Sequence, residues 1–243
     1  MTTAACERLG WDSEFFGISV GRVTVPRLTP ELVEAIADWV RCERIDCLYF
    51  LCDPTCLRSS PLAERAGFRL TDVRVTLKLG VAPHVAPHPA VRLAIPGDAD
   101  ALATIARVSH TDSRFYFDGH FPVERCDALY EAWIRRSLAG WAAAVFVAED
   151  HGRPAGYVTC HRDDRGGGSI GLIGVAQSAQ GSGLGMQLVS AACAWMAEHC
   201  ISPVTVATQG RNVRAQRLYQ RAGFVTADVG LWFHRWSAPP GVA

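Results

Sequence analysis

A run of closely spaced glycines is the segment of this sequence whose residue types are best suited to binding chemistry. Gln180-Gly-Ser-Gly-Leu-Gly185 follows Gly171–Val175, an apolar stretch that predicts a short strand. After it, apolar residues recur at the spacing of one helical face: Leu184, Leu188, Ala192 and Trp195. Glycines let backbone N–H groups approach a ligand closely, and a helix N-terminus favours negative charge. The segment therefore predicts a phosphate or pyrophosphate site, although glycines also simply mark tight turns.

Two other phosphate-binding patterns fit this segment less well. A dinucleotide site expects Gly-x-Gly-x-x-Gly after the first strand of a domain and an acidic residue about 20 positions later, and the order here is different. A Walker loop needs Gly-Lys-Ser/Thr, whereas the only lysine is Lys78. Hydrolysis of nucleoside triphosphates is therefore not expected.

A second polar constellation follows Val204–Ala207, which predicts the next strand. Asn212 opens a predicted helix that carries Tyr219 and ends at Gly223-Phe224. A phenol can donate a proton to a leaving group, so Tyr219 is a candidate acid. Packing on a helix face is the alternative role for this tyrosine.

The two segments together resemble the GNAT superfamily of N-acyltransferases, which use acetyl coenzyme A (acetyl-CoA). Val175-x4-Gln180-Gly-x-Gly-x-Gly185 matches the pyrophosphate motif of that family. Asn212-x3-Gln216-x2-Tyr219-x3-Gly223-Phe224 matches its second signature at the usual separation. The resemblance covers roughly Val91–Trp236 at superfamily level.

More of the chain resembles one branch of this superfamily, the dTDP-fucosamine acetyltransferases. These enzymes N-acetylate a nucleotide-linked 4-amino sugar. The resemblance is carried by Trp11–Gly17, by the Tyr49-Phe-Leu-x-Asp53 strand and by Ser113–Tyr116. It implies an amino sugar as the acyl acceptor.

The superfamily resemblance implies a role for each matching residue. The backbone of Ile173 and Val175 would contact the pantetheine arm, with one amide near the thioester carbonyl as an oxyanion donor. Six consecutive residues would hold the pyrophosphate: Gln180, Gly181, Ser182, Gly183, Leu184 and Gly185. Asn212 would steady the pantetheine arm, and Tyr219 would act as the general acid.

Neither motif supplies the general base that must deprotonate an attacking amine. The candidates are His110, Asp112, Asp118, His120 and His161. We favour His120 and Asp112, because the polar and aromatic segment 109–122 is long enough to form a loop for the acceptor. A structural or surface role is the alternative for each, and ordered water is an alternative proton acceptor.

The same segment holds two candidate substrate-binding residues. Arg114 is expected to hold a phosphate of the acceptor, and Tyr116 to stack on its base or sugar. An ordinary packed loop is the alternative.

Alternating strands and helices are expected to position these residues. Apolar periodicity predicts helices over 30–44, 96–110 and 123–138, and strands over 46–51, 142–148 and 156–161. The proline-rich stretch Gly80–Ala90 predicts an extended linker. We therefore expect two domains, a degenerate GNAT-like domain over 1–85 and a GNAT acyltransferase domain over 91–243.

The two halves share a short repeat at an offset of 156 residues, Leu62–Phe68 and Leu218–Phe224. In each copy a helix is expected to end at a glycine suited to a left-handed cap. We favour an ancient duplication, with chance similarity as the alternative. The first copy has Ala63 in place of Tyr219 and lacks the glycine run. The superfamily resemblance implies an α/β (α+β) GNAT fold, with a mixed, mostly antiparallel central sheet flanked by helices and a smaller, degenerate GNAT-like first half.

Composition disfavours several other classes of protein. Lys and Arg total 24 against 24 Asp and Glu, so no bulk charge attracts nucleic acid or an anionic membrane. No apolar run approaches the roughly 20 residues of a membrane helix, and the start lacks a secretory signal. We expect a cytoplasmic protein with reduced thiols and no metal, since the nine cysteines include no Cys-x-x-Cys pair.

The expected function is transfer of an acyl group to a primary amine of a small molecule such as a nucleotide-linked amino sugar. The donor would be acetyl-CoA or another phosphopantetheine thioester. An acyl carrier protein is the alternative source of that arm, and its acidic helix would face an arginine cluster: Arg211, Arg214, Arg217 and Arg221. A solvated face is the plainer explanation of the cluster. A CoA-binding module without turnover is a second alternative, which the presence of both Asn212 and Tyr219 disfavours.

Overall fold

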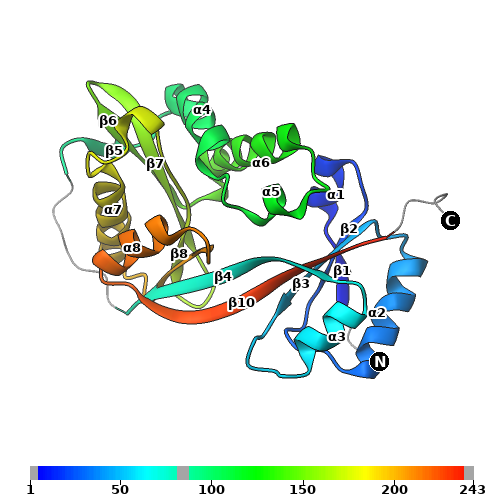
Figure 1. Cartoon of the computed structure of the whole chain (residues 1–243). Helices are drawn as coiled ribbons and strands as arrows, with labels where there is room; N and C mark the ends of the chain where they lie inside the picture. Colours follow the sequence, from blue (N-terminus) through cyan, green and yellow to red (C-terminus); the bar gives the residue numbers. More distant parts are fainter. Residues whose placement is uncertain (1–4, 81–87, 238–243) are drawn as a thin grey trace. The chain divides into compact units, whose positions relative to one another are not determined.

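The computed structural model describes residues 5–80 and 88–237, which form two compact units (Figure 1). Unit 1 contains the residues up to Arg74, the segment Phe117–His120 and the residues from Val229 onward. Unit 2 contains Val75–Tyr116 and Phe121–Asp228. The expected division into 1–85 and 91–243 stays a prediction, and residues 81–87 of its linker lie outside the described residues.

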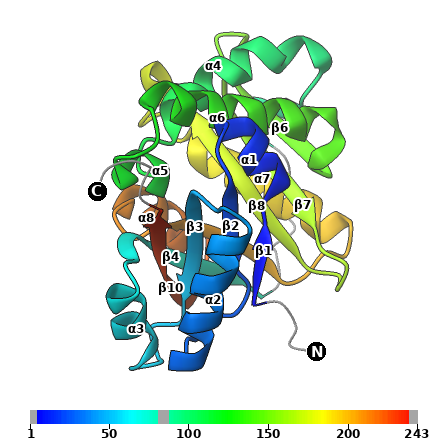
Figure 2. The same cartoon turned by 90° about the vertical axis from the view of Figure 1, so that its right-hand side faces the viewer.

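Unit 1 is built on three short strands and parts of two long ones. Its elements are β1 (Cys6–Arg8), α1 (Gly10–Phe16), β2 (Val20–Val23), α2 (Pro30–Cys42), β3 (Cys47–Cys52), α3 (Ser59–Arg65), the start of β4 (Arg69–Leu79) and the end of β10 (Val225–Trp236). β2 and β3 are parallel, whereas β1 with β2 and β3 with β10 are antiparallel. Thr29 caps α2, which lies across β3 and buries Ile36 and Val40 in one apolar cluster with Phe50 (Figure 2).

Unit 2 has the strand order β4-β9-β8-β7-β6-β5. Its other elements are β5 (Val91–Leu93), α4 (Ala99–Ser109), the start of α5 (Arg114–Asp118), α6 (Val123–Arg136), β6 (Ala144–Asp150), β7 (Arg153–Arg162), β8 (Gly168–Val175), α7 (Leu184–Glu198), β9 (Val204–Gln209) and α8 (Val213–Arg221). Short helical turns occupy Pro96–Asp98, Ser137–Trp141 and Gln177–Ala179. β8 and β9 are parallel, and the pairs from β5 to β8 are antiparallel. The predicted α/β fold with a mixed, mostly antiparallel sheet is confirmed.

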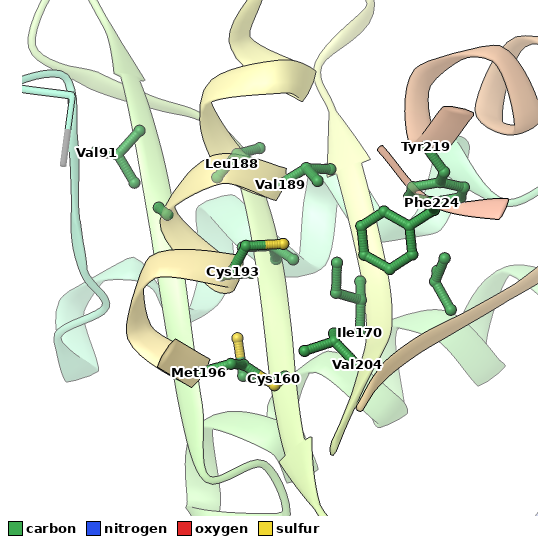
Figure 3. Close-up of a cluster of buried hydrophobic side chains, with 14 of the residues drawn as sticks. Val91, Cys160, Ile170, Leu188, Val189, Cys193, Met196, Val204, Tyr219 and Phe224 are labelled. Atoms are coloured by element: carbon green, nitrogen blue, oxygen red, sulfur yellow. The ribbon is translucent and has the colours of Figure 1, made fainter. Parts of the chain in front are cut away.

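Strand β7 lies at the centre of unit 2 and is buried on both faces. Every residue from Ala155 to Cys160 is buried. Side chains alternate across a strand, so Cys160 joins the apolar cluster under α7 with Leu188 and Met196 (Figure 3). Tyr157 points to the opposite face, where its hydroxyl meets His110 at the end of α4. Helices therefore cover both sides of the strands that carry the glycine loop.

The helices and strands expected from periodicity are present, with boundaries shifted by a few residues. The helix expected over 30–44 ends at Cys42, and the one expected over 123–138 ends at Arg136. The helix expected over 96–110 divides into a 3₁₀ turn and α4. Helix ends fray and depend on local caps that periodicity does not encode.

The sequence repeat is also a structural repeat. The series α2-β3-α3-β4 corresponds to α7-β9-α8-β10, and α3 and α8 end at residues 65 and 221. Gly67 and Gly223 follow with φ of 83° and 90°. In both copies the next residue closes the turn, since the amides of Phe68 and Phe224 donate at 3.0 Å to the fifth carbonyl before them. The two copies therefore share one helix-to-strand connection.

Within the described residues, no helix has the length and apolar character that crossing a bilayer requires. In the same part of the chain no group of three His, Cys, Asp or Glu side chains is placed to hold a metal ion.

Replacing Gly67 with alanine is expected to lower the free energy of unfolding by about 1–2 kcal/mol, because a Cβ disfavours the left-handed conformation. Nothing lies within 4 Å of that Cβ, so the cost is conformational rather than steric. Gly10→Ala is the control, since Gly10 has an ordinary φ and equally open space. Urea unfolding of both variants measures the difference, and equal stabilities would contradict the proposed cap.

Candidate functional site

A cavity of about 740 Å³ lies within unit 2. Four segments line it: the end of α4 with the two residues Thr111 and Asp112, the last three residues of β8, the glycine loop with the start of α7, and α8 with Asn212. Residues 109–112 and residues 212–221 are far apart in the sequence, and members of both segments line the same cavity. The cavity is where the expected donor and acceptor would have to meet.

One wall of the cavity exists because two parallel strands part. β8 pairs with β9 only from Gly168 to Ile170, although β8 continues to Val175 and β9 to Gln209. At the same level β8 bulges against β7, and the Leu172 amide donates to the Thr159 hydroxyl at 2.9 Å. The edge of β8 over Ile173–Val175 is therefore turned to the cavity instead of to a neighbouring strand, as the role implied for Ile173 and Val175 requires.

The glycine loop presents a series of backbone donors to the cavity. Gly181 and Gly183 have φ of 88° and 91°, and Gly183 begins α7 without a side-chain cap. The Ser182 hydroxyl closes the turn onto the Ala179 carbonyl at 2.6 Å. Within the described residues no acceptor binds the amides of residues 181–185. Five consecutive N–H groups at a helix N-terminus suit a phosphate or pyrophosphate.

Gln180 connects the loop to both neighbouring elements. Its Nε2 donates to the Val175 carbonyl at 3.3 Å, and its Oε1 accepts from Arg214 Nη1 at 2.5 Å. The glutamine side chain therefore spans from the end of β8 to α8 and holds the Arg214 guanidinium beside the free amides. The family resemblance implied that Gln180 contacts the pyrophosphate directly. The geometry adds a second role, because Gln180 also positions Arg214.

Asn212 lines the cavity and also begins α8. Its Oδ1 accepts from the Ala215 amide at 2.9 Å, which is an N-cap. Gln216 Nε2 donates to the carbonyls of Gln209 and Gly210, so it fixes the loop from which Asn212 projects. The Asn212–Gln216 part of the second motif thus has a structural role that explains its spacing.

Tyr219 lies on the buried side of α8 and is not among the residues that line the cavity. Only 3% of its surface is exposed, and its ring lies 6.0 Å from that of Phe224 in the apolar cluster (Figure 3). Burial raises the pKa of the Tyr219 phenol, so it keeps its proton at neutral pH. The packing role fits this position, and the acid role implied by the resemblance stays a prediction.

The opposite end of the cavity is formed by residues from the end of α4. Asp112 lines it, and Arg211 Nη1 donates to the Asp112 carbonyl at 3.4 Å. His110 lies in the interior, where its Nε2 is 2.8 Å from the Tyr157 hydroxyl and its ring stacks on Tyr130. Burial lowers the pKa of His110 to about 4, so this histidine is neutral at physiological pH. Of the two favoured bases, Asp112 is the one in the cavity wall.

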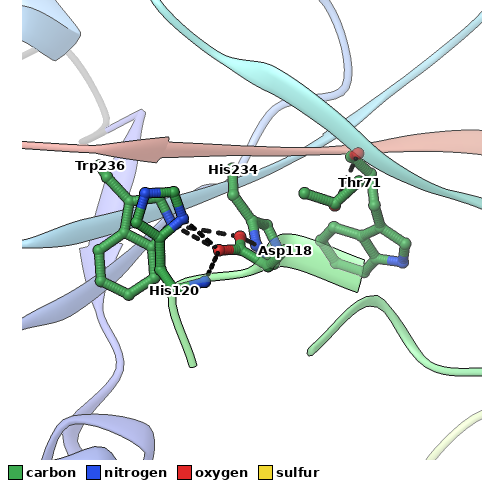
Figure 4. Close-up of polar contacts among 6 residues, drawn as sticks. Thr71, Asp118, His120, His234 and Trp236 are labelled. Carbon is green, nitrogen blue, oxygen red and sulfur yellow. Dashed lines mark hydrogen bonds and ion pairs between the residues drawn. The ribbon is translucent and has the colours of Figure 1, made fainter. Parts of the chain in front are cut away.

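His120, the other favoured base, lies in a polar cluster of unit 1 (Figure 4). Its Nδ1 is 2.8 Å from Asp118 Oδ1, and its ring stacks on Trp236. Asp118 also accepts hydrogen bonds from His234 Nδ1 and from Trp236 Nε1. Burial raises the pKa of Asp118, but these donors outweigh it and hold that pKa at about 2. Asp118 is thus an ionised anchor rather than a base.

The remaining predicted residues lie outside the cavity lining. Arg114 and Tyr116 belong to α5, and the Arg114 guanidinium stacks over the Phe115 ring at 4.3 Å. The Tyr116 hydroxyl donates to Asp127 at 2.6 Å. His161, a less favoured base, packs on Trp141 and lies 3.2 Å from the Thr159 hydroxyl. Acceptor binding by Arg114 and Tyr116 stays a prediction.

Among the polar residues of the lining, sequence reasoning gave no direct role in the site to Ser109, Thr111, Arg214 and Arg221. The two arginines were considered only as part of a surface for a carrier protein. Their spacing of seven residues places both on one helical face, and this periodicity was the available signal. Ser109 and Thr111 had no such signal, because only the packing of α4 against β7 brings them to β8.

Asp118→Asn is expected to lower the free energy of unfolding by about 2–4 kcal/mol, because an amide cannot accept from the three side-chain donors and the His120 backbone amide together. Asp38→Asn is the control, since Asp38 pairs only with the exposed Arg41 on the surface of α2. Urea unfolding at neutral pH measures both. Equal stabilities of the two variants would contradict the anchoring role.

The same anchor predicts a pH dependence. The pKa of Asp118 in the folded chain, about 2, lies below the ordinary value of about 3.9. Its contribution is therefore complete above about pH 4 and is lost as the pH falls toward 2. Unfolding measured across this range should show a steeper loss for the wild type than for Asp118→Asn, and parallel curves would contradict the ionised state.

Known proteins are similar to this chain in sequence and in fold. The Acetyltransferase (GNAT) family profile matches residues 106–224. The spore coat polysaccharide biosynthesis protein SpsD of Bacillus subtilis is 32% identical over 142 residues, 58% of this chain and 48% of SpsD. The dTDP-fucosamine acetyltransferase of Escherichia coli is 27% identical over 238 residues, 96% of this chain and 98% of that protein. This chain thus spans about half of SpsD but nearly all of the fucosamine enzyme.

The fold is also similar to that of a solved GCN5-related N-acetyltransferase from Sphaerobacter thermophilus. The TM-score is 0.66 at 16% identity, over 96% of this chain and 76% of that one. The family match begins inside α4 and ends at Phe224, so it includes every residue that lines the cavity. The part of the chain that builds the cavity is therefore the part that matches the GNAT acetyltransferase family, residues 106–224.

Proposed function

We propose that this chain transfers an acetyl group from acetyl-CoA to a primary amine of a small molecule, by direct attack in a ternary complex. The observation that carries the proposal is the cavity in which five unpaired amides of the glycine loop adjoin the unpaired edge of β8. These two features suit the two ends of a phosphopantetheine thioester, its pyrophosphate and its acylated arm.

The residues present fit such a donor. The amides of residues 181–185 are donors for phosphate oxygens, and nothing lies within 4 Å of a Cβ built on Gly181 or Gly183. The free edge of Ile173–Val175 can pair with the amide groups of the pantetheine arm, as a strand would. The bound donor would supply the activated acyl group, and the chain's residues would orient it.

The chain's groups then have defined tasks in the transfer. The amine nitrogen forms a bond to the acyl carbon while the carbon–sulfur bond breaks. A β8 backbone amide stabilises the charge that builds on the carbonyl oxygen. Tyr219 gives its proton to the departing thiolate, and a base takes the proton of the amine. A raised pKa keeps the phenol protonated for this task, although it also weakens the phenol as an acid.

Asp112 is the base that the cavity supports better, because this residue belongs to the lining. His120 remains the second candidate, since Asp118 fixes its Nδ1 and leaves Nε2 to accept a proton. Ordered water is the third route for the proton.

The proposed acceptor is a nucleotide-linked amino sugar. This proposal rests on the relative of similar length, the dTDP-fucosamine acetyltransferase, with which this chain aligns over 96% of its residues. Arg114 and Tyr116 are proposed to contact the nucleotide or sugar, although the Tyr116 hydroxyl is already bonded to Asp127. A thymidine diphosphate 4-amino sugar is therefore the first acceptor to test.

Gly183→Ala is expected to weaken the binding of CoA at least tenfold, because a Cβ at φ of 91° strains the loop that aims the amides. Gly152→Ala is the matched control: Gly152 also has a positive φ, of 72°, but it lies in the β6–β7 turn outside the cavity lining. Titration calorimetry with CoA measures both. Equal affinity in the Gly183 variant and the control would refute the loop assignment.

Tyr219→Phe is expected to reduce turnover by roughly 10² or more with little change in CoA affinity, if the phenol is the proton donor. Thiol release with acetyl-CoA and the amino sugar reports turnover, and calorimetry reports affinity. The unfolding midpoint shows whether the core is intact. Unchanged turnover would leave Tyr219 with its packing role alone.

Asp112→Asn and His120→Gln distinguish the two candidate bases. Loss of the base should lower kcat/KM at neutral pH by roughly 10²-fold. Only one of the two variants is expected to do so. If both keep the wild-type kcat/KM, the proton leaves through water.

A further inference from the structure

Helix α8 and the segment before it carry an unusual concentration of positive charge. Four arginines occur within residues 211–221, and Glu198 is the only carboxylate between Asp164 and Asp228. The chain as a whole has 24 basic and 24 acidic residues. The acidic residues that balance these arginines therefore lie elsewhere in the sequence.

Two of the four arginines line the cavity, Arg214 and Arg221. They are seven residues apart, which corresponds to two turns of one helical face and a rise of about 10 Å. Arg217 lies on the same helix but outside the lining. Within the described residues none of these three has a carboxylate as an ion-pair partner. The cavity therefore contains two cationic groups whose charge no described carboxylate neutralises through an ion pair.

The two arginines differ in what surrounds them. Arg214 is held by Gln180, next to the free amides that begin at Gly181. Arg221 lies at the other end of α8, beyond Leu218, whose side chain is the nearest group to a Cβ built on Gly185. Asp112 is the only carboxylate in the cavity wall. Positive charge thus extends from the glycine loop along α8.

We propose that Arg221 binds the 3′-phosphate of CoA while Arg214 assists the amides at the pyrophosphate, so that the acyl donor is free CoA and not a carrier protein. This inference rests on the proposed function. A phosphomonoester carries about −1.5 to −2 charge near neutral pH and adds to the charge of the pyrophosphate. A carrier-bound arm brings a single phosphodiester into the cavity, which would leave one arginine without an anion. The number and spacing of the cationic groups match the nucleotide better.

Calorimetry with CoA, 3′-dephospho-CoA and 4′-phosphopantetheine tests this assignment. The wild type is expected to bind CoA at least about tenfold more tightly than dephospho-CoA, because a charge-assisted bond to phosphate is among the stronger hydrogen bonds. Arg221→Gln should remove this preference. Arg214→Gln should weaken both nucleotides and keep their ratio. Arg217→Gln is the control, with the same change of charge on the same helix, and should keep the wild-type values.

Three results would overturn the assignment, and they differ in what they say about the donor. Equal binding of CoA and dephospho-CoA would refute the 3′-phosphate site alone and leave the acetyl-CoA donor intact. Binding of phosphopantetheine as tightly as CoA would show that the nucleotide contributes nothing and would favour a carrier protein. Absence of binding by all three would refute the proposed function as well. The three arginines are exposed, so their replacement should not disturb folding. The unfolding midpoint of each variant checks this.

Discussion

The separation of β8 from β9 after Ile170 is the constraint on which the site depends. A parallel pair that continued to Val175 would satisfy its own backbone groups and leave no wall for a ligand. Because the pair stops, β8 keeps an open edge, the glycine loop begins at its end, and α8 approaches from β9. The bulge opposite Thr159 bends β8 at the level where pairing ends. The open edge of β8 and the glycine loop that follows it therefore form one site.

The rest of unit 2 holds this opening in place. β7 is buried on both faces, with α7 packed on one side and the end of α4 on the other. The His110–Tyr157 hydrogen bond fixes the residues on either side of His110, and both line the cavity. Gly174 has no room for a side chain, since a Cβ there would lie 2.8 Å from the Tyr157 ring. The cavity lining and the core thus share residues. A substitution that alters the packing of the core therefore also alters the cavity.

The repeat explains why one half of the chain has the chemistry and the other does not. Both copies connect a helix to a strand through a left-handed glycine, at Gly67 and Gly223. The first copy has a fully buried Ala63 where the second has Tyr219, and no glycine run precedes it. The shared connection needs only the glycine and the phenylalanine that follows, whereas a phosphate site also needs free amides. A repeat can therefore keep its shape after its binding residues are gone.

Local patterns in the sequence predicted the helices, the strands and the glycine loop, because periodicity and special backbone conformations are local properties. The motif resemblance added the fold class and the expected roles of Asn212 and Tyr219. Tertiary structure decided which distant segments meet. It placed Asp112 in the cavity wall, His120 beside Asp118 in unit 1, and Tyr219 among core residues. Contacts between α4 and β7, or between Gln180 and Arg214, join segments far apart in the chain. No local pattern encodes such contacts, because they follow from how the elements pack.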